Sequence, residues 1–599
     1  MATTEKNQQR ADKSLPVLAA ALMLLTVIAY LPALTGKFVF DDYPLIADSR
    51  MIKASDGLYR IWFTTEAPFA YYPLTSSLWW FGWRLWGANP MGYHVVNVLL
   101  HAANAVLVWL VLKRLRIPGA WVAALVFAIH PVNVATAAWV SEQKNTLSMF
   151  FYAVATLLYL EFDGTNGRRW YGLSLAAFLL ALLSKTAVVM LPVVLLGCVW
   201  WLHRKVRGKD SLNSLPFFVL SVVMGLVTIW YEYYRSIGGH QSLRTVGFPF
   251  RLATAGCVPW FYLYKALLPV NLTMIYPKWE IDPSRWVSYV PGVALIGALL
   301  FFWWKRNAWG RPLLFGLGYF VVTLFPVLGF FDQSFYRYSL VADHWQYYSI
   351  VGPVALIVAA GSRICLRMGK RGQRIGVVAS VAVLAVLAGA TWKRAAVYRS
   401  EETLWRDTLT RNPNAAEAHY NLGVGLVREG RTEEAIEQWK QQLQAEPDDV
   451  EAHYNLGVAM ERLGRTQEAI QYYEQVLRLK PDNVRAHNNL GRILLNTGHV
   501  QDAIMHFELV LRLKPDNAGV HYALGNALLQ VGRVQEAIGH YEQALRIKPD
   551  FAEAQDNWGN ALLQAGRVQE AIQHYEQALR IKPDFVQAQR NLARARAIQ

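Results

Sequence analysis

The sequence predicts an all-α protein in two parts: a bundle of membrane-spanning helices over residues 1–399 and a helical-repeat solenoid over residues 400–599. The chain is 54% hydrophobic and 13% aromatic, which is too apolar for a soluble protein of this length. Apolar runs of about 17 to 22 residues, long enough to cross a hydrocarbon core, recur between residues 15 and 392. After residue 400 these runs stop and a 34-residue repeat begins.

The pattern of basic residues predicts the topology of the first part. Predicted spans cover residues 15–34, 94–112, 119–135, 146–161, 171–184, 187–202, 213–234, 287–304, 312–331, 346–366 and 376–392. Clusters of Lys and Arg occur at the N-terminus and on every second connection, as expected of cytoplasmic loops. The apolar segment 251–270 would break this alternation as a span, so we predict a re-entrant or interfacial helix there. The N-terminus then lies inside, whereas the first loop and all residues after 393 lie outside.

The charge distribution agrees with a membrane protein. Residues 416–599 carry 20 Lys and Arg against 24 Asp and Glu, a net charge of −4. Since the whole chain has a net charge of +16, the first 415 residues carry +20. Topology explains this excess better than nucleic-acid binding does. Cys198, Cys257 and Cys365 lie in or beside apolar runs without CxxC spacing, which argues against a disulfide framework or a zinc site. The first apolar run is predicted to be a retained helix rather than a cleaved signal.

The repeats follow the tetratricopeptide pattern. The unit reads AEAHYNLGVGLVREGRTEEAIEQWKQQLQAEPDD, with a Gly in the first helix, an Ala in the second and a Pro that ends the second helix. The predicted units are a half repeat at 400–415, full repeats at 416–449, 450–483, 484–517, 518–551 and 552–585, and a capping helix at 586–599. Such a stack forms a solenoid with a concave groove.

One position of the repeat carries a ladder of asparagines. Its members are Asn421, Asn455, Asn489, Asn557 and Asn591, and Ala523 is the exception. An Asn side chain can both donate to and accept from a peptide backbone, and a similar ladder in the nucleocytoplasmic O-GlcNAc transferase grips acceptor peptides. The ladder therefore suggests acceptor binding. The alternative is a consensus residue that orders its own helix turn.

Two adjacent acids, Asp41 and Asp42 in FVFDDYPLI, follow the first predicted span on the outer face. A hydroxyl that attacks a sugar must lose its proton, and a carboxylate within hydrogen-bond reach can take it. Adjacent side chains point in different directions, so we expect one base, with Asp42 favoured, and one structural or metal-binding partner. The alternative is that both acids only cap a short helix.

Four outer-face residues could meet a negatively charged phosphate: Lys144, Lys185, Arg337 and His344. Lys144 could instead form an ordinary loop pair with Glu142. Lys185 lies between two apolar runs, where a charge must find a partner or snorkel. Asp343 and His344 could bind metal or phosphate, or cap the following span. His94, His101 and His130 are not spaced as a ligand cluster.

An ordered series of sequence blocks carries a resemblance to a known family. FVFDDYPLI, YYPLTSSLWW, GYHVVNVLLHAANAVL, HPVNVATAAWVSEQKNTLSMFF, LLSKTAVVMLPVVLL, WFYLYKALLPVNLTMIYPKW and YSLVADHWQYY occur in this order, before the repeats. The chain resembles the transmembrane and tetratricopeptide-repeat O-mannosyltransferases, which belong to the GT-C glycosyltransferases. One departure is Tyr72, where that family often has an arginine. If that arginine holds donor phosphate, other cations must do so here, or the donor or the activity differs.

The resemblance implies transfer of mannose from a polyprenyl-phosphate donor in the membrane to Ser or Thr hydroxyls of exported proteins, which the repeats would recruit. It also favours the plasma membrane of a bacterium. An acid pair is compatible with a divalent metal and with none. The alternatives are a non-catalytic membrane scaffold that assembles envelope or secretion partners, and a transferase that acts on a lipid or glycan. Acids that line a cavity together with the predicted cations would favour an enzyme.

Overall fold

The computed structural model describes residues 2–66, 71–236 and 246–598, so residues 237–245 of a predicted outer loop lie outside the described residues. Every regular element in these ranges is a helix, which confirms the predicted all-α class. The chain divides into two compact units, Met1–Asn421 and Leu422–Gln599, and each is described by itself.

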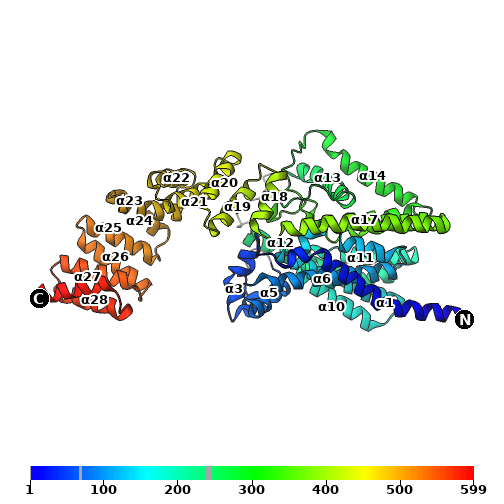
Figure 1. The fold of residues 1–599 in the computed structure, drawn as a ribbon, viewed down its shortest axis with the longest axis horizontal. Coiled ribbons are helices and arrows are strands. Elements are labelled where there is room, and N and C mark those ends of the chain that lie inside the picture. Colours follow the sequence, from blue (N-terminus) through cyan, green and yellow to red (C-terminus); the bar gives the residue numbers. More distant parts are fainter. Residues whose placement is uncertain (1, 67–70, 237–245, 599) are drawn as a thin grey trace. The chain divides into compact units, whose positions relative to one another are not determined.

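The first unit contains long apolar helices and short connecting helices (Figure 1). The α-helices are α1 (Ala2–Ala29), α2 (Leu31–Leu34), α3 (Arg50–Lys53), α4 (Gly57–Phe63), α5 (Pro73–Trp86), α6 (Pro90–Arg114), α7 (Ala120–Ala128), α8 (Val134–Ala137), α9 (Gln143–Thr165), α10 (Arg168–Ser184), α11 (Leu191–His203), α12 (Gly208–Tyr231), α13 (Phe248–Leu267), α14 (Val290–Trp304), α15 (Gly310–Leu324), α16 (Val351–Arg367), α17 (Gly369–Val397) and α18 (Glu401–Arg411). Short 3₁₀ or π turns are η1 (Tyr43–Ala47), η2 (Pro131–Asn133), η3 (Val140–Glu142), η4 (Thr186–Val188), η5 (Glu232–Ser236), η6 (Trp286–Tyr289), η7 (Phe325–Val327), η8 (Ser334–Arg337) and η9 (Asp343–Gln346).

The apolar helices coincide with the predicted spans. In the described residues seven helical segments are long and apolar enough to cross a membrane, and the bent pair α7 with η2–α8 would make eight. The other predicted spans fall on the shorter apolar stretch Leu15–Ala29 and on α10 and α16, of 17 residues each. The count of eleven spans therefore stays a prediction. The 20-residue helix α13, predicted to be interfacial or re-entrant, is not among the seven.

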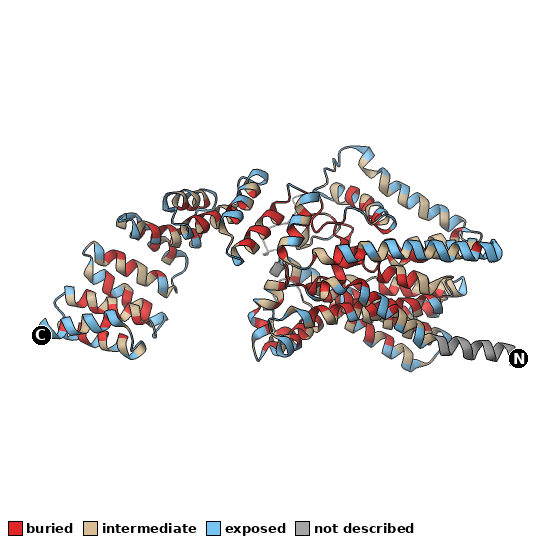
Figure 2. Ribbon diagram, viewed as in Figure 1, coloured by how far each residue is buried: buried red, intermediate tan, exposed pale blue. Residues whose placement is uncertain are grey.

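The core of the first unit forms where α6 packs against α1, α7 and α9, and where α9 lies along α10. At the periphery α14 has no buried residue and α17 is mostly exposed, as the pale blue and tan ribbon of Figure 2 shows. On a spanning helix, apolar side chains that face outward meet lipid rather than water. The backbone can lie in lipid because a helix satisfies its own hydrogen bonds.

The repeat region consists of antiparallel helix pairs. Its helices are α19 (Ala416–Arg428), α20 (Thr432–Ala445), α21 (Val450–Arg462), α22 (Thr466–Leu479), α23 (Val484–Asn496), α24 (Val500–Leu513), α25 (Ala518–Gln530), α26 (Val534–Ile547), α27 (Ala552–Gln564), α28 (Val568–Ile581) and α29 (Val586–Ile598). The repeated Ala (Ala435, Ala469, Ala503, Ala537, Ala571) is fully buried in every pair. The repeated Gly faces an aromatic ring: a Cβ on Gly457 would lie 2.7 Å from the ring of Tyr473. The two helices of each pair can pack closely only because these residues are small.

Candidate active site

The acid pair lies on a loop between α2 and η1. Phe40, directly before the acids, adopts a left-handed backbone with φ of 48°, which is uncommon for a residue with a bulky side chain. The two carboxylates after this residue lie in different surroundings: Asp41 is half-buried and lines a cavity, whereas Asp42 is fully buried and does not.

Asp42 is held by backbone N–H groups. Its Oδ2 accepts from the N–H of Val39 at 3.0 Å, and its Oδ1 accepts from the N–H of Ser141, 99 residues away, at 2.7 Å. Burial raises the pKa of Asp42 to about 8, and these two hydrogen bonds oppose the rise. With both oxygens occupied, Asp42 fastens the loop to the start of η3. Which acid is the base stays a prediction, and the cavity geometry favours Asp41 over Asp42.

Asp41 opens into a cavity of about 580 Å³ that also receives Lys144, Lys185, Arg337 and His344. These residues lie between positions 41 and 344 of the sequence, so only the tertiary fold brings them together. Burial raises the pKa of Asp41, whereas Lys144 and Arg337 oppose the rise. Tyr72 lines the cavity as well, and burial raises the pKa of its hydroxyl, which keeps it neutral and able to donate.

Glu142 connects the two lysines of the cavity. Its side chain is 1% exposed, its Oε1 lies 2.9 Å from Lys144 Nζ, and its Oε2 lies 3.5 Å from Lys185 Nζ. Asn145 donates to the same carboxylate. Burial lowers the pKa of Lys185 to about 8, although Glu142 opposes this change. The cavity lining therefore places the cationic side chains of Lys144, Lys185 and Arg337 among several carboxylates, and Glu142 holds the two lysines side by side, where an anionic group could meet them.

His344 and Asp343 face different surroundings. The ring of His344 lies in the cavity lining, edge-on to Trp139 and Phe335 at centroid distances of 5.6 and 5.7 Å, and burial lowers its pKa to about 3. Burial thus favours the neutral form of the His344 ring, and its contact with phosphate stays a prediction. Asp343 is not part of the cavity lining and accepts a hydrogen bond of 2.7 Å from the Tyr276 hydroxyl.

The other side of the same cavity is apolar. Val222, Gly225, Leu226 and Ile229 of α12 line it, and the side chains of Val222, Leu226 and Ile229 are exposed. Because α12 belongs to one of the segments able to cross a membrane, this wall lies where lipid can reach it. The cavity therefore combines an acid, cations and a hydrocarbon-compatible wall.

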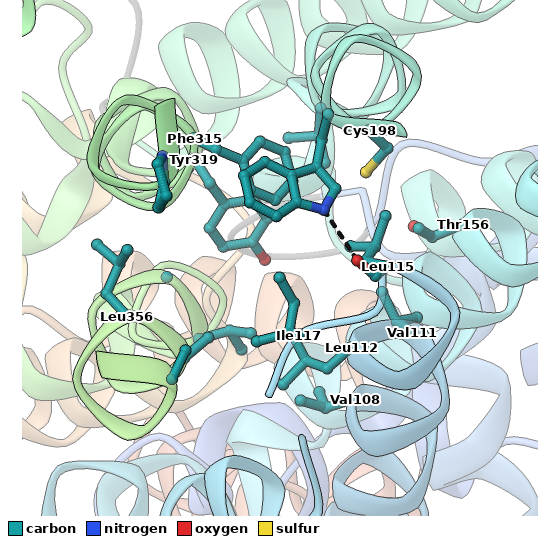
Figure 3. A pocket seen from close by; sticks show the side chains of 18 of the residues that line it. Val108, Val111, Leu112, Leu115, Ile117, Thr156, Cys198, Phe315, Tyr319 and Leu356 are labelled. Atoms are coloured by element: carbon teal, nitrogen blue, oxygen red, sulfur yellow. Dashed lines mark hydrogen bonds between the residues drawn. The ribbon is translucent and has the colours of Figure 1, made fainter. Parts of the chain in front are cut away.

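A second cavity, of about 180 Å³, lies among α6, α9, α11, α15 and α16 (Figure 3). Apolar side chains such as Val108, Leu112 and Phe315 dominate its lining. Among the described residues that line it, Arg363 carries a charge. Among the described residues its lining holds no carboxylate, histidine or lysine; its polar side chains include Thr156, Cys198 and Tyr319.

The asparagine ladder makes hydrogen bonds inside the solenoid. Asn489 Nδ2 donates to the hydroxyl of Tyr454 in the preceding repeat at 3.1 Å, and Asn557 Nδ2 donates to Tyr522 in the same way at 3.0 Å. Asn591 donates to Asp556 at 2.9 Å. In the described structure Asn455 Nδ2 is buried without an acceptor, and Asn421, in the first unit, bonds to Glu417 of its own helix. Acceptor binding by the ladder stays a prediction.

Sequence reasoning did not identify Glu142 as the centre of the cation cluster. The SEQKN motif that contains it could have signalled this, since a carboxylate two residues from a lysine beside a span needs a partner. Within the described residues no three His, Cys, Asp or Glu side chains gather as a metal site.

Two family models match different parts of the chain. Residues 68–233 match the family described as dolichyl-phosphate-mannose-protein mannosyltransferase, and residues 400–599 match the tetratricopeptide repeat in overlapping segments. The first match contains Tyr72, Glu142, Lys144 and Lys185 but not Asp41. A segment similar to the mannosyltransferase family thus precedes the repeats.

Two relatives are named as protein O-mannosyl-transferases. Protein O-mannosyl-transferase F38B6.6 of Caenorhabditis elegans is 23% identical over 458 residues, which cover 72% of this chain and 62% of that protein. Protein O-mannosyl-transferase TMTC4 of Homo sapiens is 25% identical over 484 residues, 69% of this chain and 64% of that protein. The chain thus aligns with somewhat less than two thirds of each relative. The predicted resemblance to the transmembrane and tetratricopeptide-repeat O-mannosyltransferase family is confirmed.

Among solved structures, MamA 41-end from Desulfovibrio magneticus RS-1 is 24% identical, with 28% of this chain and 96% of that chain covered, and a TM-score of 0.28. This likeness carries no functional argument.

Proposed function

We propose that this protein is a membrane glycosyltransferase that transfers a sugar, most simply mannose, from a polyprenyl-phosphate donor to hydroxyls of exported proteins. The observation that carries the proposal is the shared cavity, which places Asp41 with Lys144, Lys185 and Arg337 beside the apolar wall of α12. The matched mannosyltransferase family and the names of the relatives support the sugar and the protein acceptor.

The proposed reaction assigns a role to each group. Asp41 takes the proton of the acceptor hydroxyl as its oxygen attacks the anomeric carbon of the sugar. The bond from that carbon to the phosphate oxygen breaks, and the polyprenyl phosphate leaves with an added negative charge. Lys144, Lys185 and Arg337 stabilise that charge, while His344 and Tyr72 act as neutral donors. The apolar wall of α12 receives the start of the lipid tail.

The proposed orientation has the N-terminus in the cytoplasm and the cavity and repeats outside, in the plasma membrane of a bacterium. It rests on the positive-inside pattern of the loops. The repeats would recruit the protein acceptor, with Asn489 and Asn557 among the groups that contact it.

Radiolabelled sugar transfer in lipid tests the catalytic role of Asp41. Wild type, Asp41→Asn and Asp42→Asn are compared with Asp48→Asn, an exposed acid on the same outer segment. We expect Asp41→Asn to lower the rate by about 10²-fold or more with the fold intact, Asp42→Asn to lose stability, and Asp48→Asn to behave as wild type. Full activity of Asp41→Asn would refute Asp41 as the base. A wild-type protein that transfers no sugar from several polyprenyl-phosphate donors would favour the scaffold alternative.

A further inference from the structure

The helix α18 forms part of the first compact unit, together with the catalytic loop, although its sequence introduces the repeats. Ser400 caps its start through a hydrogen bond from the Thr403 N–H to Ser400 Oγ at 3.2 Å. Arg394, near the end of α17, forms an ion pair with Asp407 of α18, and the side chain of Arg394 is only 7% exposed. These contacts attach α18 firmly to the end of the last membrane helix.

Trp405 of α18 reaches the residue next to the proposed base. It is fully buried, and its ring meets Phe40 edge-on at 5.2 Å with an interplanar angle of 85°. Phe40 also contacts the rings of Trp139 and Tyr338 at 5.9 and 6.4 Å, and it lines the cavity beside Asp41. Aromatic pairs of this kind are worth about 1 kcal/mol beyond the area they bury.

The backbone at Phe40 explains why such support is needed. Its left-handed conformation costs about 1 kcal/mol or more for a non-glycine residue and persists only when surrounding contacts hold it. Directly after this residue, Asp41 lines the cavity and Asp42 accepts from the N–H groups of Val39 and Ser141. Loss of the Trp405 ring removes one of the three aromatic contacts that hold the turn.

Two hydrogen bonds join the two ends of α18 to loops near the cavity. The N–H of Lys37 donates to the carbonyl of Arg399 at 2.9 Å, so the chain just before α18 pairs with the chain just before Asp41. At the other end, Asn412 Nδ2 donates to the carbonyl of Ile275 at 3.4 Å. Ile275 precedes Tyr276, whose hydroxyl binds Asp343, the neighbour of His344 in the cavity lining.

We propose that α18 is a positioning element of the catalytic centre, in which Trp405 holds Asp41 in its reactive position through Phe40. The inference rests on the proposed function in taking Asp41 as the base. Since α18 also leads into the repeats, it provides a physical route by which acceptor engagement could influence the base. Trp405 itself touches no reacting group and is not a catalytic residue.

The test compares full-length variants in lipid by two independent measurements. Trp405→Ala removes the ring, Trp405→Phe keeps an aromatic contact, and Leu404→Ala opens a cavity at a neighbouring position of the same helix that is equally buried. If Trp405→Ala does not fold, Trp405→Leu replaces it. Hydrogen exchange of the segment 36–46 reports loop order without any activity, and steady-state transfer separates kcat from the donor KM.

We expect Trp405→Ala to speed exchange of the segment 36–46 by about 10-fold relative to Leu404→Ala. We also expect it to lower kcat by about 10²-fold, because small displacements of a catalytic group have large effects, with the donor KM within about twofold of wild type. Trp405→Phe should restore both. Equal exchange and equal kcat in Trp405→Ala and Leu404→Ala would overturn the inference. Failure of wild type to transfer sugar would instead refute the proposed function, and the exchange comparison would still decide whether Trp405 holds the loop.

Discussion

Replacement of Glu142 by glutamine should destabilise the protein strongly, because it removes the carboxylate that two buried lysines share. The carboxylate lies 2.9 Å from Lys144 and 3.5 Å from Lys185, and all three side chains are at most 13% exposed. Breaking a buried ion pair by removal of one partner costs about 3 to 5 kcal/mol, since the remaining charge is left in a poorly solvated position. We expect a loss of about 3 kcal/mol or more in the free energy of unfolding.

A matched control separates burial from distance. Asp56 and Arg60 form an ion pair of the same length, 2.9 Å, but these side chains are 53% and 38% exposed. Asp56→Asn should therefore change stability very little, because water and salt already screen the pair. Reversible unfolding in mixed detergent–lipid micelles measures both variants under the same conditions.

The same variant also tests the cavity as an anion site. Glu142→Gln leaves Lys144 and Lys185 without the carboxylate that they share, so inorganic phosphate should bind more tightly than to wild type and recover stability. At 100 times its Kd, phosphate would restore about 2.7 kcal/mol. Equal stability losses in Glu142→Gln and Asp56→Asn, or no effect of phosphate on Glu142→Gln, would refute the reasoning.

Three further outcomes follow from the described contacts. Gly457→Ala should destabilise the solenoid by about 1 to 3 kcal/mol because its Cβ would meet the Tyr473 ring, whereas Gly539→Ala, with open space around it, should stabilise by up to about 1 kcal/mol; urea unfolding compares the two. Burial lowers the pKa of His540, so protonation favours the unfolded chain and stability falls as pH drops below about 6.5. His540→Gln should therefore flatten the profile of thermal stability against pH between pH 5 and 7.5. An unchanged slope would contradict this. Lys185, with a pKa of about 8, should lose its charge as pH rises through that value, so binding of a polyprenyl phosphate should weaken there in wild type but not in Lys185→Arg; parallel pH profiles would argue against Lys185 as a phosphate ligand.

Some of the site could be predicted from single residues. A carboxylate beside a span, and Lys144 or Lys185 at the edge of an apolar run, are costly unless they have partners or a function, and this local rule identified members of the cavity. The same rule could not rank Asp41 and Asp42. Their roles differ because Asp42 accepts from Ser141, 99 residues away, and no local pattern encodes such a contact.

By itself the sequence determined the properties that depend on local periodicity: apolar runs of membrane length, the alternation of basic loops, and a 34-residue repeat whose small Gly and Ala let helices pack closely. The tertiary structure decided which acid faces the cavity, that Glu142 joins the two lysines, and that α18 packs with the catalytic loop through Trp405 and Phe40. The physical reason is range. Hydrophobic periodicity acts over one helix turn or one repeat, whereas the cavity arises from contacts between segments up to several hundred residues apart, which only the packed helices bring within hydrogen-bond distance.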